Sequence, residues 1–276
     1  LRSQAVVPAR IARFVAKLQD EQARLRTLRW RAVNELNLEA VFRLSLALLT
    51  NAEQQLFACL AACVATDFGL AAAAASAGLT EEAAGEPLSR LVNLALVDYD
   101  ADLERFRLHA LLYLFARSEA ERLQILLEAE RGHARYFVTY TRQRQTLSGI
   151  NLYELTREQS AILQTAAWMV TQRNLDPLFW HGLRQLLDAR GHWQDAIALI
   201  QSYIDLADEL GNDLNKAHFY LQLGRYYRHL ANFDKAVTVY QYSLTILEGY
   251  GDQRGIAMVL NSLGGALERK GQLDEA

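Results

Sequence analysis

The chain has 276 residues, of which 51% are hydrophobic and 22% are charged, and its formal net charge is −3. This length suits about two domains, and the balance of residues allows a substantial buried core. The lack of a basic excess argues against a surface that binds nucleic acid or anionic lipid. No apolar run approaches the ~18 residues of a membrane-spanning helix, so we expect no membrane contact. The two closely spaced cysteines, Cys59 and Cys63, fit a reducing cytoplasm, where we expect the protein to be located.

A scarcity of helix breakers predicts a mainly α-helical protein, because the chain contains only 3 prolines. Two cysteines, Cys59 and Cys63, are too close in sequence for a disulfide framework, and we interpret them as buried thiols. The segment Thr50–Glu53 has the pattern of a capping box, in which Thr and Glu each satisfy a backbone amide. Apolar spacing predicts helices over residues 9–28, 37–49, 54–64, 70–77 and, opened by Pro87 after a short turn capped by Thr80, 87–94.

The helical period is interrupted after residue 94. Leu96–Tyr99 and Arg105–Leu108 are short strand candidates joined by a polar link, which predicts a β-hairpin. A helix is expected to resume over residues 109–116. Three or four helices followed by a small hairpin is the order of a winged helix, a variant of the helix-turn-helix.

The predicted helix before the hairpin, with the residues that lead into it, is acidic. It carries Glu81, Glu82 and Glu86 but a single basic residue, Arg90. These carboxylates would repel phosphates, which opposes the main electrostatic contribution to nucleic-acid affinity. We therefore do not expect direct DNA binding by this helix.

Beyond the hairpin region, residues 119–145 predict one or two long charged helices, and Leu147–Thr156 predicts a loop. Helices are then expected over residues 157–173 and again after Pro177.

The last third of the chain repeats itself every 40 residues. The blocks Gly191–Ala196, Ala231–Ala236 and Gly271–Ala276 share a small residue, a variable one, a large apolar one, two polar ones and alanine. A fixed period in this range indicates a stacked array of helical repeats. Because the chain begins without Met and stops at Ala276 inside an expected helix, we expect a fragment of a longer protein.

The second repeat resembles a tetratricopeptide repeat, which is a helix-turn-helix unit. The resemblance rests on Leu223, Gly224, Tyr227, Ala231, Phe233, Ala236 and Tyr240. Small residues at Gly224 and Ala236 would let the two helices approach closely, and the large residues would fill the space between units. The first unit differs, with Arg184 in the place of the glycine.

Three stretches upstream, Leu48–Glu53, Leu88–Asp98 and Arg105–Leu112, follow one another in an order that resembles the winged-helix domain of NB-ARC, or STAND, signalling ATPases. The last stretch is similar to the family's Met-His-Asp motif, with Leu108 and Ala110 replacing Met and Asp. In that family the histidine contacts the β-phosphate of bound ADP and holds the protein off, so the resemblance implies this role for His109. A histidine that only caps or packs at a strand–helix junction is the alternative.

The resemblance extends to the ends of the chain and implies a domain order. Val6–Pro8 is similar to a Gly-x-Pro motif that lies against adenine, with Val in place of Gly; a proline that merely starts a helix is the alternative. The implied domains are the end of the helical subdomain of the ATPase core (1–36), a winged helix (37–118), a helical connector (119–175) and tetratricopeptide repeats, the last truncated (176–276).

No sequence motif for catalysis is present. The chain contains no Gly-x-x-x-x-Gly-Lys, no His-Glu-x-x-His and no Gly-x-Ser-x-Gly. We therefore expect this fragment not to be an enzyme, and to hold no metal or cofactor. The resemblance implies ADP or ATP only for the full-length protein, whose nucleotide-binding domain would lie outside this fragment.

The first helix of each repeat is expected to line the concave side of the array. Arginine suits carboxylates and phosphates, and asparagine can pair with a peptide backbone. A merely solvated helix face is the alternative. Aligning the repeats predicts a partner-binding face formed by His181, Gln185, His218, Arg225, Arg228, His229, Asn261 and Arg269.

These features together suggest the regulatory and sensor half of a STAND-type signal-transduction ATPase. The repeats would bind a protein or peptide signal, and the winged helix would help to hold the absent nucleotide-binding domain of the same chain in its ADP-bound off state. The signal would shift the protein toward an open, oligomerising state. The alternatives are a non-enzymatic scaffold or adaptor, and part of a transcriptional regulator whose DNA-binding domain lies outside the fragment.

Overall fold

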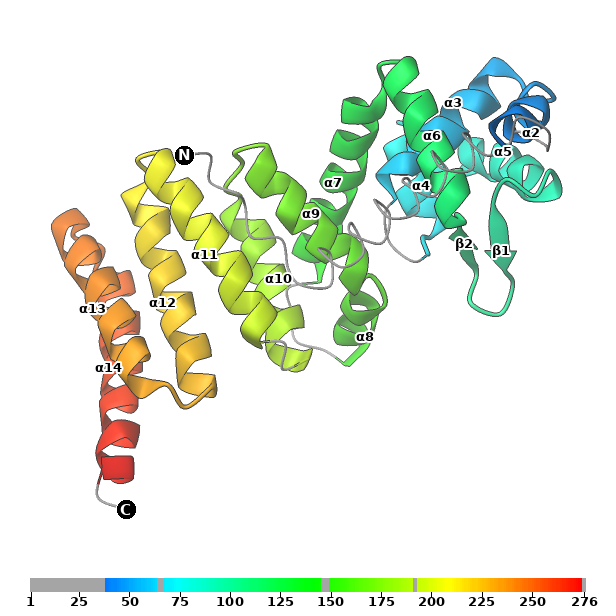
Figure 1. Ribbon diagram of the computed structural model, residues 1–276. Helices are drawn as coiled ribbons and strands as arrows, with labels where there is room; N and C mark the ends of the chain where they lie inside the picture. Colours follow the sequence, from blue (N-terminus) through cyan, green and yellow to red (C-terminus); the bar gives the residue numbers. More distant parts are fainter. Residues whose placement is uncertain (1–37, 64–66, 145–148, 191–192, 275–276) are drawn as a thin grey trace. The chain divides into compact units, whose positions relative to one another are not determined.

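The computed structural model describes residues 38–63, 67–144, 149–190 and 193–274 (Figure 1). In these residues the protein is mainly α-helical, with a single two-stranded antiparallel sheet, which confirms the predicted fold class. The helix predicted over residues 9–28 lies outside the described residues, as does Pro8. The chain divides into two compact units. We call the described residues up to Thr165 the N-terminal unit, and those from Ala166 the C-terminal unit; the predicted domain boundaries stay predictions.

The N-terminal unit contains the predicted helix–hairpin–helix order. Its elements are α2 (Leu38–Leu46), α3 (Asn51–Cys59), the 3₁₀ turn η1 (Leu60–Ala62), α4 (Leu70–Ser76), α5 (Glu81–Asn93), β1 (Asp98–Asp100), β2 (Arg105–Arg107), α6 (Ala110–Arg122), α7 (Leu126–Gln143), α8 (Gly149–Arg157) and the first half of α9 (Gln159–Thr171).

The start of α3 has the predicted capping box. The Thr50 hydroxyl accepts a hydrogen bond from the Glu53 amide at 3.3 Å, and the Glu53 carboxylate accepts one from the Thr50 amide at 2.7 Å. These bonds satisfy two amides that have no partner within the helix. They also lower the pKa of the Glu53 carboxyl, because they stabilise its charged form.

Helix α5 corrects one prediction. It runs without interruption from Glu81, capped by Thr80, and Pro87 lies inside it rather than at its start. A proline within a helix removes one backbone hydrogen bond. Ala84, Leu88 and Leu91 form a fully buried stripe on both sides of Pro87, and this tertiary packing holds the helix together.

Helix α8 corrects another prediction, because Leu147–Thr156 was expected to be a loop. Leu155 is 1% exposed, so the segment contributes to the core. The Tyr140 hydroxyl donates to the Glu154 carbonyl at 3.2 Å, and the Arg144 guanidinium pairs with the Glu154 carboxylate. These contacts with α7 stabilise a short helix whose sequence is a weak helix former.

The hairpin is confirmed, although its strands are shorter than predicted. Tyr99 pairs with Phe106 across the two strands. Phe106 also exchanges two backbone hydrogen bonds of 2.9 Å with Phe68, from the segment before α4. The hairpin is therefore joined to the helical core through its second strand.

Helices α4 and α7 approach very closely in the same unit. A Cβ added at Gly132 in α7 would lie 2.3 Å from the Ala75 carbonyl oxygen in α4, so this position requires glycine. The neighbouring His133 is 3% exposed and its ring lies 4.8 Å from that of Phe137. Burial lowers the pKa of His133 to about 4, because desolvation disfavours the imidazolium.

This burial predicts a pH dependence of stability. Between the ordinary histidine pKa of 6.5 and the folded value of about 4, the unfolded chain binds the additional proton. The free energy of unfolding should therefore fall as the pH is lowered through this interval, by about 3 kcal/mol in total from this group. Urea unfolding at pH 7.5 and pH 5 should show that His133→Gln removes part of the wild-type decrease; an identical decrease in both proteins would contradict the assignment.

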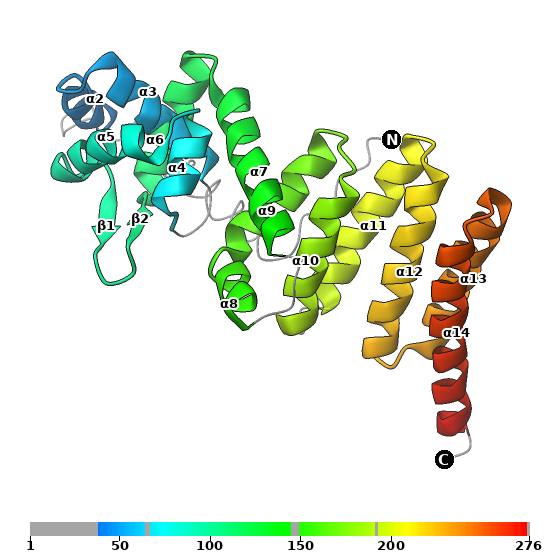
Figure 2. The ribbon, with the colours of Figure 1, turned by 180° about the vertical axis from the view of Figure 1, so that it is seen from behind.

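The C-terminal unit is a row of packed helices (Figure 2). After the end of α9, its elements are α10 (Pro177–Arg190), α11 (Trp193–Glu209), α12 (Asp213–His229), α13 (Phe233–Tyr250) and α14 (Gln253–Asp274). Each helix from α10 to α14 contacts the next in sequence, and α12 also contacts α14. The first helices of successive repeats, α12 and α14, are therefore neighbours.

The turns that connect α11 to α12, α12 to α13 and α13 to α14 share one structure. Each has a residue in the left-handed conformation, namely Gly211, Ala231 and Gly251, with φ of 63°, 55° and 67°. The next residue in each case is Asn212, Asn232 or Asp252, whose side-chain oxygen accepts a hydrogen bond from the amide three residues on, at 3.2, 3.3 and 3.0 Å. A left-handed residue ends one helix and the capping residue begins the next.

The close approach predicted at Gly224 is present. A Cβ added there would lie 2.3 Å from the Tyr240 ring, and Tyr240 is fully buried. Tyr240 thus packs directly on the α12 backbone. Gly264 in α14, one repeat later, has no such neighbour within 4 Å of an added Cβ.

These two glycines give a matched pair of substitutions. Gly224→Ala should lower the free energy of unfolding by about 1–3 kcal/mol, because the buried Tyr240 ring must move. Gly264→Ala should leave it unchanged or raise it by up to about 1 kcal/mol, because alanine is the better helix former. Urea unfolding of both variants checks this, and equal effects would contradict the close packing.

Candidate functional site

The predicted partner-binding residues of the C-terminal unit occupy different environments. Gln185 is 7% exposed in α10, so little of its side chain can reach a partner. His218 Nε2 in α12 lies 3.7 Å from Asp252 Oδ2. The His229 ring stacks on Trp193 at 5.1 Å with an interplanar angle of 17°. Asn261 and Arg269 are exposed on α14, while the His181 side chain lies outside the described residues.

Arg225 and Arg228 form the most unusual pair on this surface. Both are half-buried on α12, and in the described part of the chain neither lies within ion-pair distance of a carboxylate. Arg225 Nη1 has only a long 3.5 Å contact with Gln222 Oε1. Arg228 Nη1 would lie 3.4 Å from a Cβ added at Gly265 in α14. The Arg228 guanidinium therefore lies close to α14.

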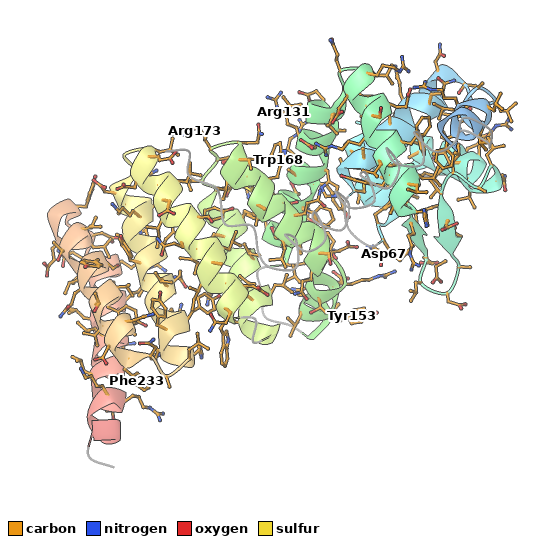
Figure 3. All side chains as sticks on the ribbon, in the orientation of Figure 1. Asp67, Arg131, Tyr153, Trp168, Arg173 and Phe233 are labelled. Carbon is orange, nitrogen blue, oxygen red and sulfur yellow. The ribbon has the colours of Figure 1, made fainter. Side chains whose placement is uncertain are left out.

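Four other basic side chains of this unit have a carboxylate partner. Ion pairs join Arg184 to Asp188, Lys216 to Asp208, Lys270 to Asp234 and, at the end of α9 (Figure 3), Arg173 to Glu209. A half-buried cation without an anion loses hydration and gains no attraction in return. Arg225 and Arg228 are therefore the residues of this unit best placed to bind an anionic group.

The Tyr240 ring from α13 packs on α12 at Gly224, next in sequence to Arg225. Burial raises the pKa of the Tyr240 phenol, and the positive charges of Arg228 and Arg225 act in the opposite direction. Residues three apart on a helix share a face, so Arg225 and Arg228 project from the same side of α12. An acidic ligand bound there would contact both.

In the N-terminal unit, His109 is exposed at the junction of β2 and α6. It is the N-cap of α6, and its Nδ1 accepts a hydrogen bond from the Leu111 amide at 3.4 Å. This bond places the proton of the neutral ring on Nε2. His109 therefore has the capping role, which the sequence offered as the alternative to a nucleotide contact. Its Nε2 remains able to donate a hydrogen bond. The predicted nucleotide contacts of His109 and Pro8 stay predictions.

The cap gives a structural test of His109. His109→Ala should lower the free energy of unfolding by about 0.5–1 kcal/mol, because the Leu111 amide loses its acceptor. His109→Asn should preserve most of the stability, since asparagine is a good N-cap. Urea unfolding distinguishes them; equal losses would show that the cap contributes nothing.

A buried ion-pair network lies beneath the hairpin. Arg105 is 6% exposed, and its Nε donates to Asp67 Oδ1 at 2.6 Å. Its two terminal nitrogens pair with the two oxygens of Glu158, one of them at 3.0 Å. Asp67 lies in the segment before α4 (Figure 3), and Glu158 lies between α8 and α9. The guanidinium therefore joins three segments that are distant in sequence.

Neither unit shows a metal centre in its described residues, because no three His, Cys, Asp or Glu side chains lie close enough together there to hold a metal ion.

The two cysteines are buried free thiols, and burial raises the pKa of Cys59 to about 11 and that of Cys63 to about 12. Such thiols remain protonated and unreactive at neutral pH. No described helix is long and apolar enough to cross a membrane.

The comparison with known proteins finds a partial similarity. A stretch of 109 residues is 38% identical to the regulatory protein AfsR of Streptomyces griseus, and it covers 40% of this chain and 11% of that protein. No model of a protein family matches the chain, and no solved structure matches it. The chain is thus similar, over less than half of its length, to a small part of a regulatory protein.

Proposed function

We propose that this chain is the regulatory and sensor part of a STAND-type signal-transduction ATPase. The repeats of the C-terminal unit bind a protein or peptide signal, and the winged-helix part helps to hold a nucleotide-bound off state. The similarity to a regulatory protein and the order of helices and hairpin support this function. The observation that carries it is the uncompensated pair Arg225 and Arg228 on the repeat surface.

The chemistry of this pair favours an acidic segment as the signal. Residues three apart on a helix share a face, so Arg225 and Arg228 can contact adjacent acidic groups of one ligand. A guanidinium binds a carboxylate through two parallel hydrogen bonds, which gives orientation as well as attraction. Arg228 lies close to Gly265 of α14, which has no side chain to cover it, and the exposed Asn261 of the same helix can pair with a ligand backbone.

The proposed role of the winged-helix part depends on His109. Its Nε2 can donate to a phosphate oxygen while Nδ1 caps α6. The ADP and its binding domain would belong to the full-length protein. A ligand on the repeats can shift the off state toward an open, oligomerising state only if its affinity differs between the two states. The chain itself supplies binding and regulation rather than catalysis.

Two other functions remain as alternatives, a non-enzymatic scaffold or adaptor and a part of a transcriptional regulator. A scaffold binds its partner through the repeats without any nucleotide. Full-length protein with His109→Asn separates these possibilities, because asparagine keeps the helix cap. Faster release of bound ADP than in the wild type supports the switch, whereas unchanged release contradicts the role of His109.

The repeat surface makes a direct prediction. A short fluorescein-labelled peptide rich in glutamate should bind the chain, and a glutamine-rich peptide of the same length should bind more weakly. Arg225→Glu with Arg228→Glu should weaken binding of the acidic peptide at least about tenfold, because each lost contact is a charge-assisted pair. Fluorescence anisotropy at constant ionic strength measures this.

The matched control changes the same charge elsewhere on the unit. Lys235→Glu with Arg254→Glu alters two exposed cations of α13 and α14. This variant should bind the acidic peptide within about threefold of the wild type, because both side chains are exposed and salt screens their charges. Equal losses in both double variants would mean that the repeats attract the peptide only through their overall charge.

A further inference from the structure

The N-terminal unit contains a cavity at the base of the hairpin that the proposed function does not use. Its volume is about 450 Å³. The first turns of α4 and α5 form one side, and the hairpin and the end of α8 form the other. Cavities of this size hold small organic groups or side chains of a partner.

The charge of this cavity is negative. Glu81 and Glu104 line it, and in the described residues neither has a cation within ion-pair distance. Arg105 also lines it, but its guanidinium is directed to Asp67 and Glu158, so it does not compensate the other carboxylates. Arg157 donates to the Leu103 carbonyl of the hairpin. Carboxylates thus outnumber guanidiniums among the lining groups and their partners.

One wall of the cavity is aromatic. The Tyr99 and Phe106 rings line it with their centroids 4.8 Å apart, and Phe106 stacks on Phe68 at 6.0 Å. Phe68 is 2% exposed whereas Tyr99 is 45% exposed, so the row of rings leads from the core to the surface. An exposed tyrosine ring beside unpaired carboxylates attracts a cation through its π face as well as through their charge.

We propose that this cavity binds a lysine or arginine side chain presented by a basic segment of a partner protein. The aliphatic stem of that side chain packs on the Tyr99 ring, and its charged end pairs with Glu81 and Glu104. The hairpin and α5 carry further exposed carboxylates at Glu82, Glu86, Asp98 and Asp102, against exposed guanidiniums at Arg90 and Arg107. The excess of carboxylates suits a segment with several cations rather than a single free amine. Phosphates are repelled for the same reason.

The test uses the whole chain and a short fluorescein-labelled peptide rich in arginine, followed by anisotropy. Glu81→Gln with Glu104→Gln should weaken binding about tenfold, because glutamine keeps the size of each side chain and removes its charge. Tyr99→Ala should weaken it about three- to tenfold through loss of the ring contact. Far-UV circular dichroism and the melting temperature verify that each variant is folded.

The matched control is Glu248→Gln with Glu268→Gln, which makes the same change of net charge on the C-terminal unit. It should bind the arginine-rich peptide as the wild type does. Unchanged affinity in the cavity variants, or an equal loss in the control, would overturn the proposal. So would arginine amide competing at the same concentration as the peptide, since the ligand would then be a free amine rather than a protein segment.

Discussion

The buried guanidinium of Arg105 is the contact on which the N-terminal unit depends. It holds the second hairpin strand against the segment before α4 through Asp67 and against the junction of α8 and α9 through Glu158. Loss of one partner from such a buried pair typically costs about 3–5 kcal/mol, because an uncompensated charge remains. His109 lies two residues after the end of β2, and the cavity lies at the base of the same hairpin. One ion-pair network therefore positions both candidate sites of this unit.

In the C-terminal unit, close packing and capped turns set the arrangement of the helices. Tyr240 lies on the backbone at Gly224, and left-handed residues followed by capping side chains make the turns. This frame leaves Arg225 and Arg228 without carboxylates, whereas the N-terminal unit leaves Glu81 and Glu104 without cations in the residues described. The net charge of −3 conceals these two surfaces of opposite sign. We therefore propose an acidic partner for the C-terminal unit and a basic partner for the N-terminal unit.

Local signals in the sequence predicted the elements that depend on neighbouring residues. The capping box at Thr50 and the close helix approach at Gly224 were each predicted from a few neighbouring residues, and both are confirmed. By contrast, α5 continues through Pro87 because the buried residues on both sides of it pack against the rest of the unit, and local sequence does not show this packing. Repeat alignment placed Gln185 on the binding face, although it is buried in the fold. The Gly-Asn and Gly-Asp pairs at residues 211–212 and 251–252 are turn signals in the sequence, and they mark two of the helix boundaries.

The cavity could not be predicted, because its carboxylates and rings come from segments that only the fold brings together. The central claim, that binding at the repeats controls a nucleotide switch, is tested most directly by the rate of ADP release from the full-length protein. The account predicts that a saturating acidic ligand of the repeats accelerates release in the wild type but not when Arg225 and Arg228 are changed to glutamate. Ligand binding to the wild type with an unchanged release rate would contradict it.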